Sequence, residues 1–111
     1  MRLVLTGLRA WLVQRASAVY LLAFILFFIG HFLFDSPGDA AAWHGWVAQP
    51  SIRVALLAAF VALLVHAWVG LRDVMLDYID PVGLRAPALA LVAGALIGIG
   101  LWMLTVLASL P

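Results

Sequence analysis

One histidine interrupts an otherwise apolar run of the chain. His66 lies within the stretch from Val54 to Leu71, where no residue is charged. A histidine in hydrocarbon costs free energy unless its ring has a partner, so it marks a functional site by default. Residues seven or 11 positions apart share one face of a helix. Before His66 this face carries the small residues Ala55, Ala59 and Ala62. After it, the face carries Gly70 and the carboxylates Asp73 and Asp77. Small residues allow a second helix or a planar ligand to approach closely.

Three roles for this imidazole remain open. It could form a hydrogen bond to a neighbouring helix, relay protons, or ligate haem iron. A proton relay needs further ionisable groups at membrane depth, and the sequence places none between Val54 and His66. Haem iron with six ligands needs a second axial ligand, but the depth of His31 differs from that of His66 by roughly 12 Å. A haem would therefore take its second ligand from another chain, and we expect His31 to be a hydrogen-bonded structural residue.

A carboxylate and a phenol, Asp77 and Tyr78, lie at the inner end of the same predicted helix, about 17 and 18 Å from His66 along its axis. The simplest interpretation is a solvated carboxylate beside a tyrosine of the interfacial aromatic belt. The functional interpretation is a quinone site, in which the phenol donates a hydrogen bond to a quinone carbonyl and the carboxylate supports proton transfer. We expect the other charges of this region, Arg72, Asp73, Asp80 and Arg85, to be plain interfacial charges, with Arg72 and Asp73 placed to screen one another.

The composition indicates that lipid surrounds these residues. Of 111 residues, 68% are hydrophobic and 10% are charged, with a mean hydropathy of +1.20. A soluble domain is nearer half apolar and a quarter charged. The net charge of +1 excludes a strongly basic nucleic-acid-binding protein. The absence of cysteine excludes disulfides, thiolate metal sites and ligands for iron–sulfur clusters.

Three apolar stretches are long enough to cross a bilayer. They run over residues 16–34, 54–71 and 86–110, and about 20 apolar residues span a hydrocarbon core of about 30 Å. Only helices satisfy the backbone of such a chain in lipid. We therefore expect an all-α membrane protein that forms a single membrane-anchor domain over residues 1–111, with transmembrane helices at about 16–34, 52–76 and 86–110. The first stretch lacks the small-residue cleavage pattern of a signal peptide.

The arginines predict the orientation of these helices. All six cations are arginine, and only Arg53 lies near the connection between the first two helices. The other five lie before the first helix or between the second and third, at Arg2, Arg9, Arg15, Arg72 and Arg85. Positively charged residues remain on the cytoplasmic side. We expect a cytoplasmic amino terminus and a periplasmic carboxyl terminus.

The connections carry turn and interface signals. Residues 35–38, Asp-Ser-Pro-Gly, are typical of a turn. Residues 39–49 are predicted to form a short helix in the outer interface, with Trp43 and Trp46 on one face. Because a residue before proline avoids helical geometry, the proline at position 81 predicts that the second long helix ends near Ile79.

The third apolar stretch contains a pattern of small residues. Ala90, Gly94 and Gly98 recur at intervals of four. This spacing favours close helix packing, but it is common in membrane helices and indicates no chemistry.

Two motifs of the second long helix identify a family resemblance. Residues 66–70, His-Ala-Trp-Val-Gly, and residues 77–81, Asp-Tyr-Ile-Asp-Pro, resemble the His-Ala-Trp-x-Gly and Asp-Tyr-x-x-Pro signature of the succinate dehydrogenase hydrophobic membrane anchor subunit. In that family, the subunit is the smaller of the two membrane anchors of respiratory complex II. Residues 14–18, Gln-Arg-Ala-Ser-Ala, are similar to the family's Arg-Ala-Ser/Thr-Ala segment. The resemblance runs from about Val13 to the end of the chain.

The resemblance implies a role for each motif residue. His66 would be an axial ligand of haem b, with the opposite ligand from the cytochrome b556-type anchor subunit. Arg15 would lie near a haem propionate, which a guanidinium group suits. Tyr78 would form a hydrogen bond to ubiquinone, with Asp77 in support. The implied partners are that second anchor, the flavoprotein and iron–sulfur subunits, ubiquinone and the lipid bilayer.

The implied function is that of a membrane anchor of succinate:quinone oxidoreductase. The chain would not oxidise succinate itself, since it has neither cluster ligands nor a dinucleotide fingerprint. The lack of an Arg- and Ser-rich transit peptide points to the bacterial cytoplasmic (inner) membrane. One alternative is a fumarate reductase anchor, and another is a small structural or transport membrane protein without haem. A transporter is expected to carry an acidic residue deep in a span, whereas all five Asp lie outside the three apolar stretches.

Overall fold

The computed structural model describes residues 7–79 and 82–109, and this part of the chain is helical, without strands. The helices are α1 (Leu8–Phe34), α2 (Ala40–Ala48), α3 (Pro50–Tyr78) and α4 (Val82–Ala108). By length and composition, α1, α3 and α4 could each cross a membrane. The expectation of an all-α protein with three spans is confirmed.

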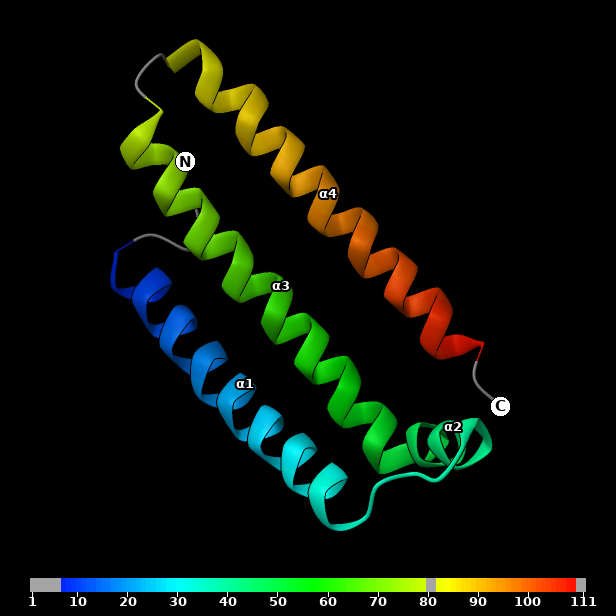
Figure 1. Cartoon of the computed structure of the whole chain (residues 1–111). Coiled ribbons are helices and arrows are strands. Elements are labelled where there is room, and N and C mark those ends of the chain that lie inside the picture. Colours follow the sequence, from blue (N-terminus) through cyan, green and yellow to red (C-terminus); the bar gives the residue numbers. More distant parts are fainter. Residues whose placement is uncertain (1–6, 80–81, 110–111) are drawn as a thin grey trace.

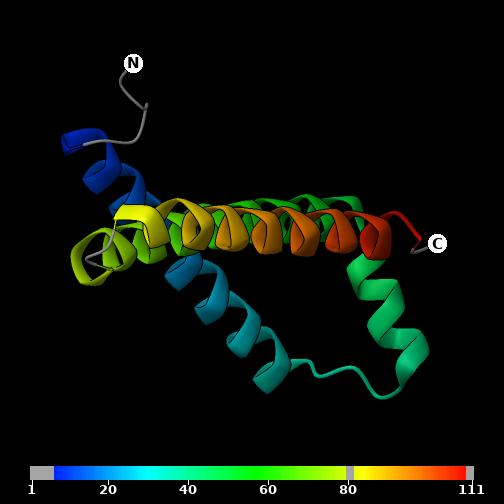
Figure 2. The same ribbon diagram turned by 90° about the horizontal axis from the view of Figure 1, so that it is seen from above.

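Helix α3 is the centre of the arrangement (Figure 1). Helix α1 packs along one side of α3 and α4 along the other. Figure 2 shows that α4 runs alongside α3, whereas α1 crosses it. The start of α1 and the end of α4 lie at opposite ends of the molecule, as an odd number of spans requires.

Local sequence signals explain several helix ends. The side chain of Asp39 accepts a hydrogen bond of 2.8 Å from the backbone N–H of Ala42, which satisfies one of the free donors at the start of α2. Pro50 occupies the first position of α3, where its missing N–H costs nothing. Helix α3 ends at Tyr78, with Ile79 in extended geometry. The predicted end near Ile79 is confirmed.

Each of the three long helices begins before its apolar stretch. Helix α1 begins at Leu8, directly after Gly7, whose φ of 59° lies in the left-handed region that favours glycine. Helix α4 begins at Val82, so Pro87 lies inside it. The first four N–H groups of a helix have no partner within it, so a proline just beyond them removes only one hydrogen bond. An apolar stretch in the sequence indicates the part of a helix that could cross the lipid, but not the helical turns that continue beyond that part.

Little of the chain is buried within itself. The apolar residues with less than a tenth of their surface exposed are Ala10, Val47, Ile52, Ala59, Val69, Met75 and Leu107. The pattern of Ala90, Gly94 and Gly98 does not mediate packing on α3, because all three residues are exposed and nothing lies within 4 Å of a Cβ at either glycine. Instead, Gly100 faces α3, where an added Cβ would come within 2.9 Å of the Leu64 side chain.

Candidate functional site

His66 lies on the face of α3 that packs against α1. Its Nδ1 atom is 3.1 Å from the hydroxyl oxygen of Ser17, a residue of α1 that is 8% exposed. That hydroxyl also donates a hydrogen bond of 3.0 Å to the backbone carbonyl of Gln14, one helical turn earlier. The imidazole is therefore held on one side by the neighbouring helix.

The small residues of the predicted stripe let α1 approach α3 closely. Ala59 is buried, and the Tyr20 hydroxyl donates a hydrogen bond of 2.9 Å to the backbone carbonyl of Ala55. A Cβ added at Gly70 would lie 3.5 Å from the Gln14 side chain, an ordinary contact distance. In the part of α3 that precedes His66, the stripe thus serves helix packing rather than a ligand.

Around His66 and toward the carboxyl-terminal end of α3, the interface of α1 and α3 opens into a cavity of about 510 Å³. Its lining combines small or aromatic residues with polar ones: Gly7, Ala10, Trp11, Gln14, Arg15, Ala18, His66, Val69, Arg72 and Asp73. The cavity brings together His66 and Arg15, which are 51 positions apart in the sequence. A site residue from each helix therefore faces the same space.

The charges of this cavity are an exposed arginine and an ion pair. The guanidinium carbon of Arg15 lies 5.6 Å from the centre of the Trp11 ring, within the range of a cation–π contact. Arg72 is 8% exposed, and its Nη2 and Nε atoms lie 3.1 and 3.3 Å from one carboxylate oxygen of Asp73. The expected screening between Arg72 and Asp73 is confirmed. The expectation of a plain interfacial charge at Arg72 needs one correction, because its side chain is buried rather than solvated.

Sequence reasoning missed Ser17 and Gln14 as parts of this site. The Oε1 atom of Gln14 is buried and accepts no hydrogen bond from the residues that the structure describes. Both residues belong to the segment 14–18 quoted for the family resemblance, which was the only available signal. Most buried polar atoms in proteins are hydrogen-bonded, so this free oxygen beside the cavity could accept a hydrogen bond from a bound group.

Asp77 and Tyr78 lie at the end of α3, outside the cavity. Asp77 is exposed and Tyr78 is 79% exposed. The Nε atom of Arg85 in α4 donates a hydrogen bond of 2.6 Å to the backbone carbonyl of Ile79, which ties the start of α4 to the residue after Tyr78. The structure thus holds the backbone beside this pair and leaves both side chains accessible.

His31 lies among aromatic side chains at the opposite end of α1. Its ring stacks on Trp46 of α2 and on Phe27 at centroid distances of 4.4 and 6.3 Å. It makes no side-chain hydrogen bond to any described residue, so ring packing replaces the expected hydrogen bond. Trp43 and Trp46, with centroids 5.8 Å apart, share one face of α2 as predicted.

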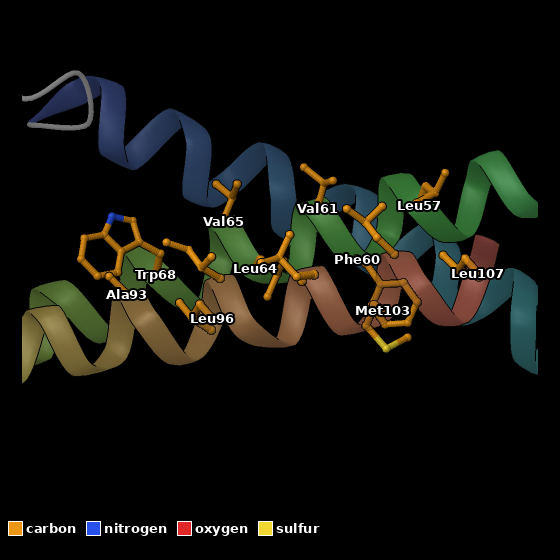
Figure 3. A pocket seen from close by; sticks show the side chains of 14 residues that line it. Leu57, Phe60, Val61, Leu64, Val65, Trp68, Ala93, Leu96, Met103 and Leu107 are labelled. Carbon is orange, nitrogen blue, oxygen red and sulfur yellow. The ribbon is translucent and has the colours of Figure 1, made fainter. Parts of the chain in front are cut away.

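A second cavity, also of about 510 Å³, lies between α3 and α4 (Figure 3). Its lining is apolar except for the indole N–H of Trp68: Leu57, Phe60, Val61, Leu64, Val65, Trp68, Ala93, Leu96, Ile97, Gly100, Leu101, Met103, Leu104 and Leu107. Such a lining offers no acid, base or charge. The polar cavity at His66 is therefore the better candidate for chemistry.

The fold and this cavity define a class: a multi-pass helical membrane protein with an imidazole directed into a polar cavity between two spans. The family model for the succinate dehydrogenase/fumarate reductase transmembrane subunit matches residues 4–107, and the chain belongs to this family. The chain is also similar to a succinate dehydrogenase hydrophobic membrane anchor subunit from Coxiella burnetii. The two are 28% identical over 96 residues, which cover 86% of this chain and 84% of that protein. The family resemblance is confirmed.

Proposed function

We propose that the chain is a membrane-anchor subunit of a succinate:quinone oxidoreductase. In this role it holds the flavoprotein and iron–sulfur subunits at the membrane, supplies one axial ligand to haem b and forms part of the ubiquinone site. The observation that supports the proposal best is the His66 imidazole, which lines a cavity between α1 and α3 together with Arg15.

The residues of the cavity fit a haem. A neutral imidazole is a common iron ligand, and the Nδ1 contact to Ser17 leaves the Nε2 atom of His66 without a hydrogen bond to any described residue. Arg15 supplies a guanidinium group that suits a carboxylate. When bound, haem b would carry single electrons. His66 would hold it from one side, and a second anchor subunit would supply the opposite ligand.

Asp77 and Tyr78 would contribute to quinone reduction at the inner interface. A phenol can donate a hydrogen bond to a quinone carbonyl, and an adjacent carboxylate can accept or pass on a proton. Both side chains are exposed in the isolated chain. This exposure fits half of a site that the iron–sulfur and cytochrome b556-type subunits complete.

The proposal includes an orientation and a compartment. The arginine distribution supports a cytoplasmic amino terminus and a periplasmic carboxyl terminus. The relative from Coxiella burnetii supports the bacterial cytoplasmic membrane. The matching family covers both succinate dehydrogenase and fumarate reductase, so a fumarate reductase anchor is the second candidate. The His-Ala-Trp and Asp-Tyr motifs favour the first.

Affinity purification of the tagged chain from native membranes tests this proposal. We expect a flavoprotein, an iron–sulfur protein and a second anchor to copurify, with a reduced-minus-oxidised spectrum typical of a b-type haem. Succinate:quinone reductase activity that exceeds fumarate reductase activity would favour the first candidate over the second. A chain that purifies in folded form without these partners and without haem would contradict the proposal.

A further inference from the structure

We infer that Ser17 is a positioning residue that fixes the tautomer and orientation of His66, so that the Nε2 lone pair is the one offered to a metal. This inference rests on the proposed function, in which His66 ligates haem iron. It concerns a residue of α1 that would touch neither the haem nor the quinone.

The direction of the hydrogen bonds follows from the number of available hydrogens. A serine hydroxyl has one hydrogen to donate, and a backbone carbonyl can only accept. The contact of 3.0 Å from Ser17 to the Gln14 carbonyl therefore uses that hydrogen. Toward the Nδ1 atom of His66, 3.1 Å away, the Ser17 oxygen can then only accept. Nδ1 must carry the hydrogen of this bond.

A neutral imidazole carries a hydrogen on only one of its nitrogens. With Nδ1 protonated, Nε2 keeps its lone pair free, and it is hydrogen-bonded to none of the described residues. Because Ser17 is 8% exposed, water has little access to replace either of its two hydrogen bonds. The contact thus selects the tautomer that a metal needs.

A hydrogen bond at Nδ1 also changes the ligand itself. A partner that accepts the second ring hydrogen fixes the ring and raises the basicity of the ligating nitrogen, and its loss typically weakens metal binding by roughly 10–100-fold. A more basic ligand stabilises ferric over ferrous iron. Ser17 should therefore lower the midpoint potential of the haem and help to retain it. A serine that served only helix packing would do neither.

The test is the haem midpoint potential of the purified complex with Ser17→Ala, Ser17→Thr or the control Thr105→Val. The Thr105 hydroxyl donates to the backbone carbonyl of Trp102, as Ser17 does to Gln14, but contacts no histidine. We expect Ser17→Ala to raise the midpoint potential, change the ferric electron paramagnetic resonance spectrum and weaken haem retention. Ser17→Thr, which keeps the hydroxyl, should restore all three, and Thr105→Val should change none.

The possible outcomes separate this inference from the proposed function. A wild-type complex without haem, or one whose haem survives His66→Ala, would overturn both. A haem that depends on His66 but has the same potential and spectrum in Ser17→Ala would overturn the inference alone. If Ser17→Ala loses its haem, recovery of haem and native potential in Ser17→Thr supports the inference. Equal loss in both variants overturns it, since the hydroxyl would then make no difference.

Discussion

His31 and Trp46 stack almost in parallel, with ring centroids 4.4 Å apart and an angle of 11° between the planes. Through this contact, α2 packs on the carboxyl-terminal end of α1. Phe27, Phe28 and Phe32 surround the pair. The two histidines of the long helices thus have different surroundings, since His31 lies among rings and His66 lines a polar cavity.

Replacement of His31 should leave the haem in place. We expect His31→Ala to destabilise the packing of α2 on α1 by about 1 kcal/mol, the usual value of an aromatic pair. His31→Phe should retain most of this stability, because a phenyl ring can still stack on Trp46. Thermal unfolding in detergent and haem content measure the two effects. Loss of haem from both variants would show that His31 does more than pack.

Removal of the Arg15 charge should lower the haem midpoint potential. A nearby positive charge favours the reduced form of the iron, so Arg15→Gln should shift the potential downward by an amount on the order of tens of millivolts. Arg9→Gln is the matched control, because Arg9 lies on the same helix but does not line the cavity. Redox titration measures both variants. Equal shifts would indicate a general charge effect rather than a contact between Arg15 and a propionate.

Tyr78→Phe should impair quinone reduction and spare succinate oxidation by an artificial acceptor. Loss of one hydrogen bond worth about 1.4 kcal/mol corresponds to a roughly tenfold lower rate. Steady-state assays with the two acceptors measure the difference.

Tyr20→Phe is the control for this experiment. The Tyr20 hydroxyl bonds to the backbone of Ala55 between α1 and α3, so its loss should lower stability and leave quinone kinetics unchanged. A Tyr78→Phe variant that loses both activities equally would point to an assembly role for Tyr78.

The carboxyl terminus should be accessible only from the periplasm. Because α1, α3 and α4 could each cross the membrane, three crossings would place the two termini on opposite sides. The arginine distribution favours a cytoplasmic amino terminus. A tag after the last residue should therefore react with an impermeant reagent in spheroplasts, whose cytoplasmic membrane is intact. Labelling only after the cytoplasmic membrane is permeabilised would reverse the proposed orientation.

Local signals explain why much of the fold was predictable from the sequence. Asp39 caps α2, Pro50 opens α3, and α3 ends just before Ile79, each because of the chemistry of one or two residues. The apolar stretches predicted three spans because lipid requires them. The start of α4 was predicted too late, because the charge-free stretch begins only after Arg85, whereas the helix already begins at Val82.

The candidate site was only partly predictable, because it depends on how α1 faces α3. His66 and Asp73 share one face of α3, and the periodicity predicted this. The periodicity of one helix cannot predict that Ser17, 49 positions earlier, meets His66, or that Arg72 is buried. These contacts are tertiary and require the relative rotation of two helices.

The optical spectrum of a His66→Ala complex tests the central claim most directly. The control is His44→Ala, since His44 is an exposed histidine of α2. We expect the His44→Ala complex to keep the wild-type spectrum of a b-type haem with two axial ligands. The His66→Ala complex, with all subunits still assembled, should lose the haem or show a ligand-deficient spectrum. An assembled His66→Ala complex whose haem spectrum matches the wild type would contradict the assignment of His66 as the axial ligand.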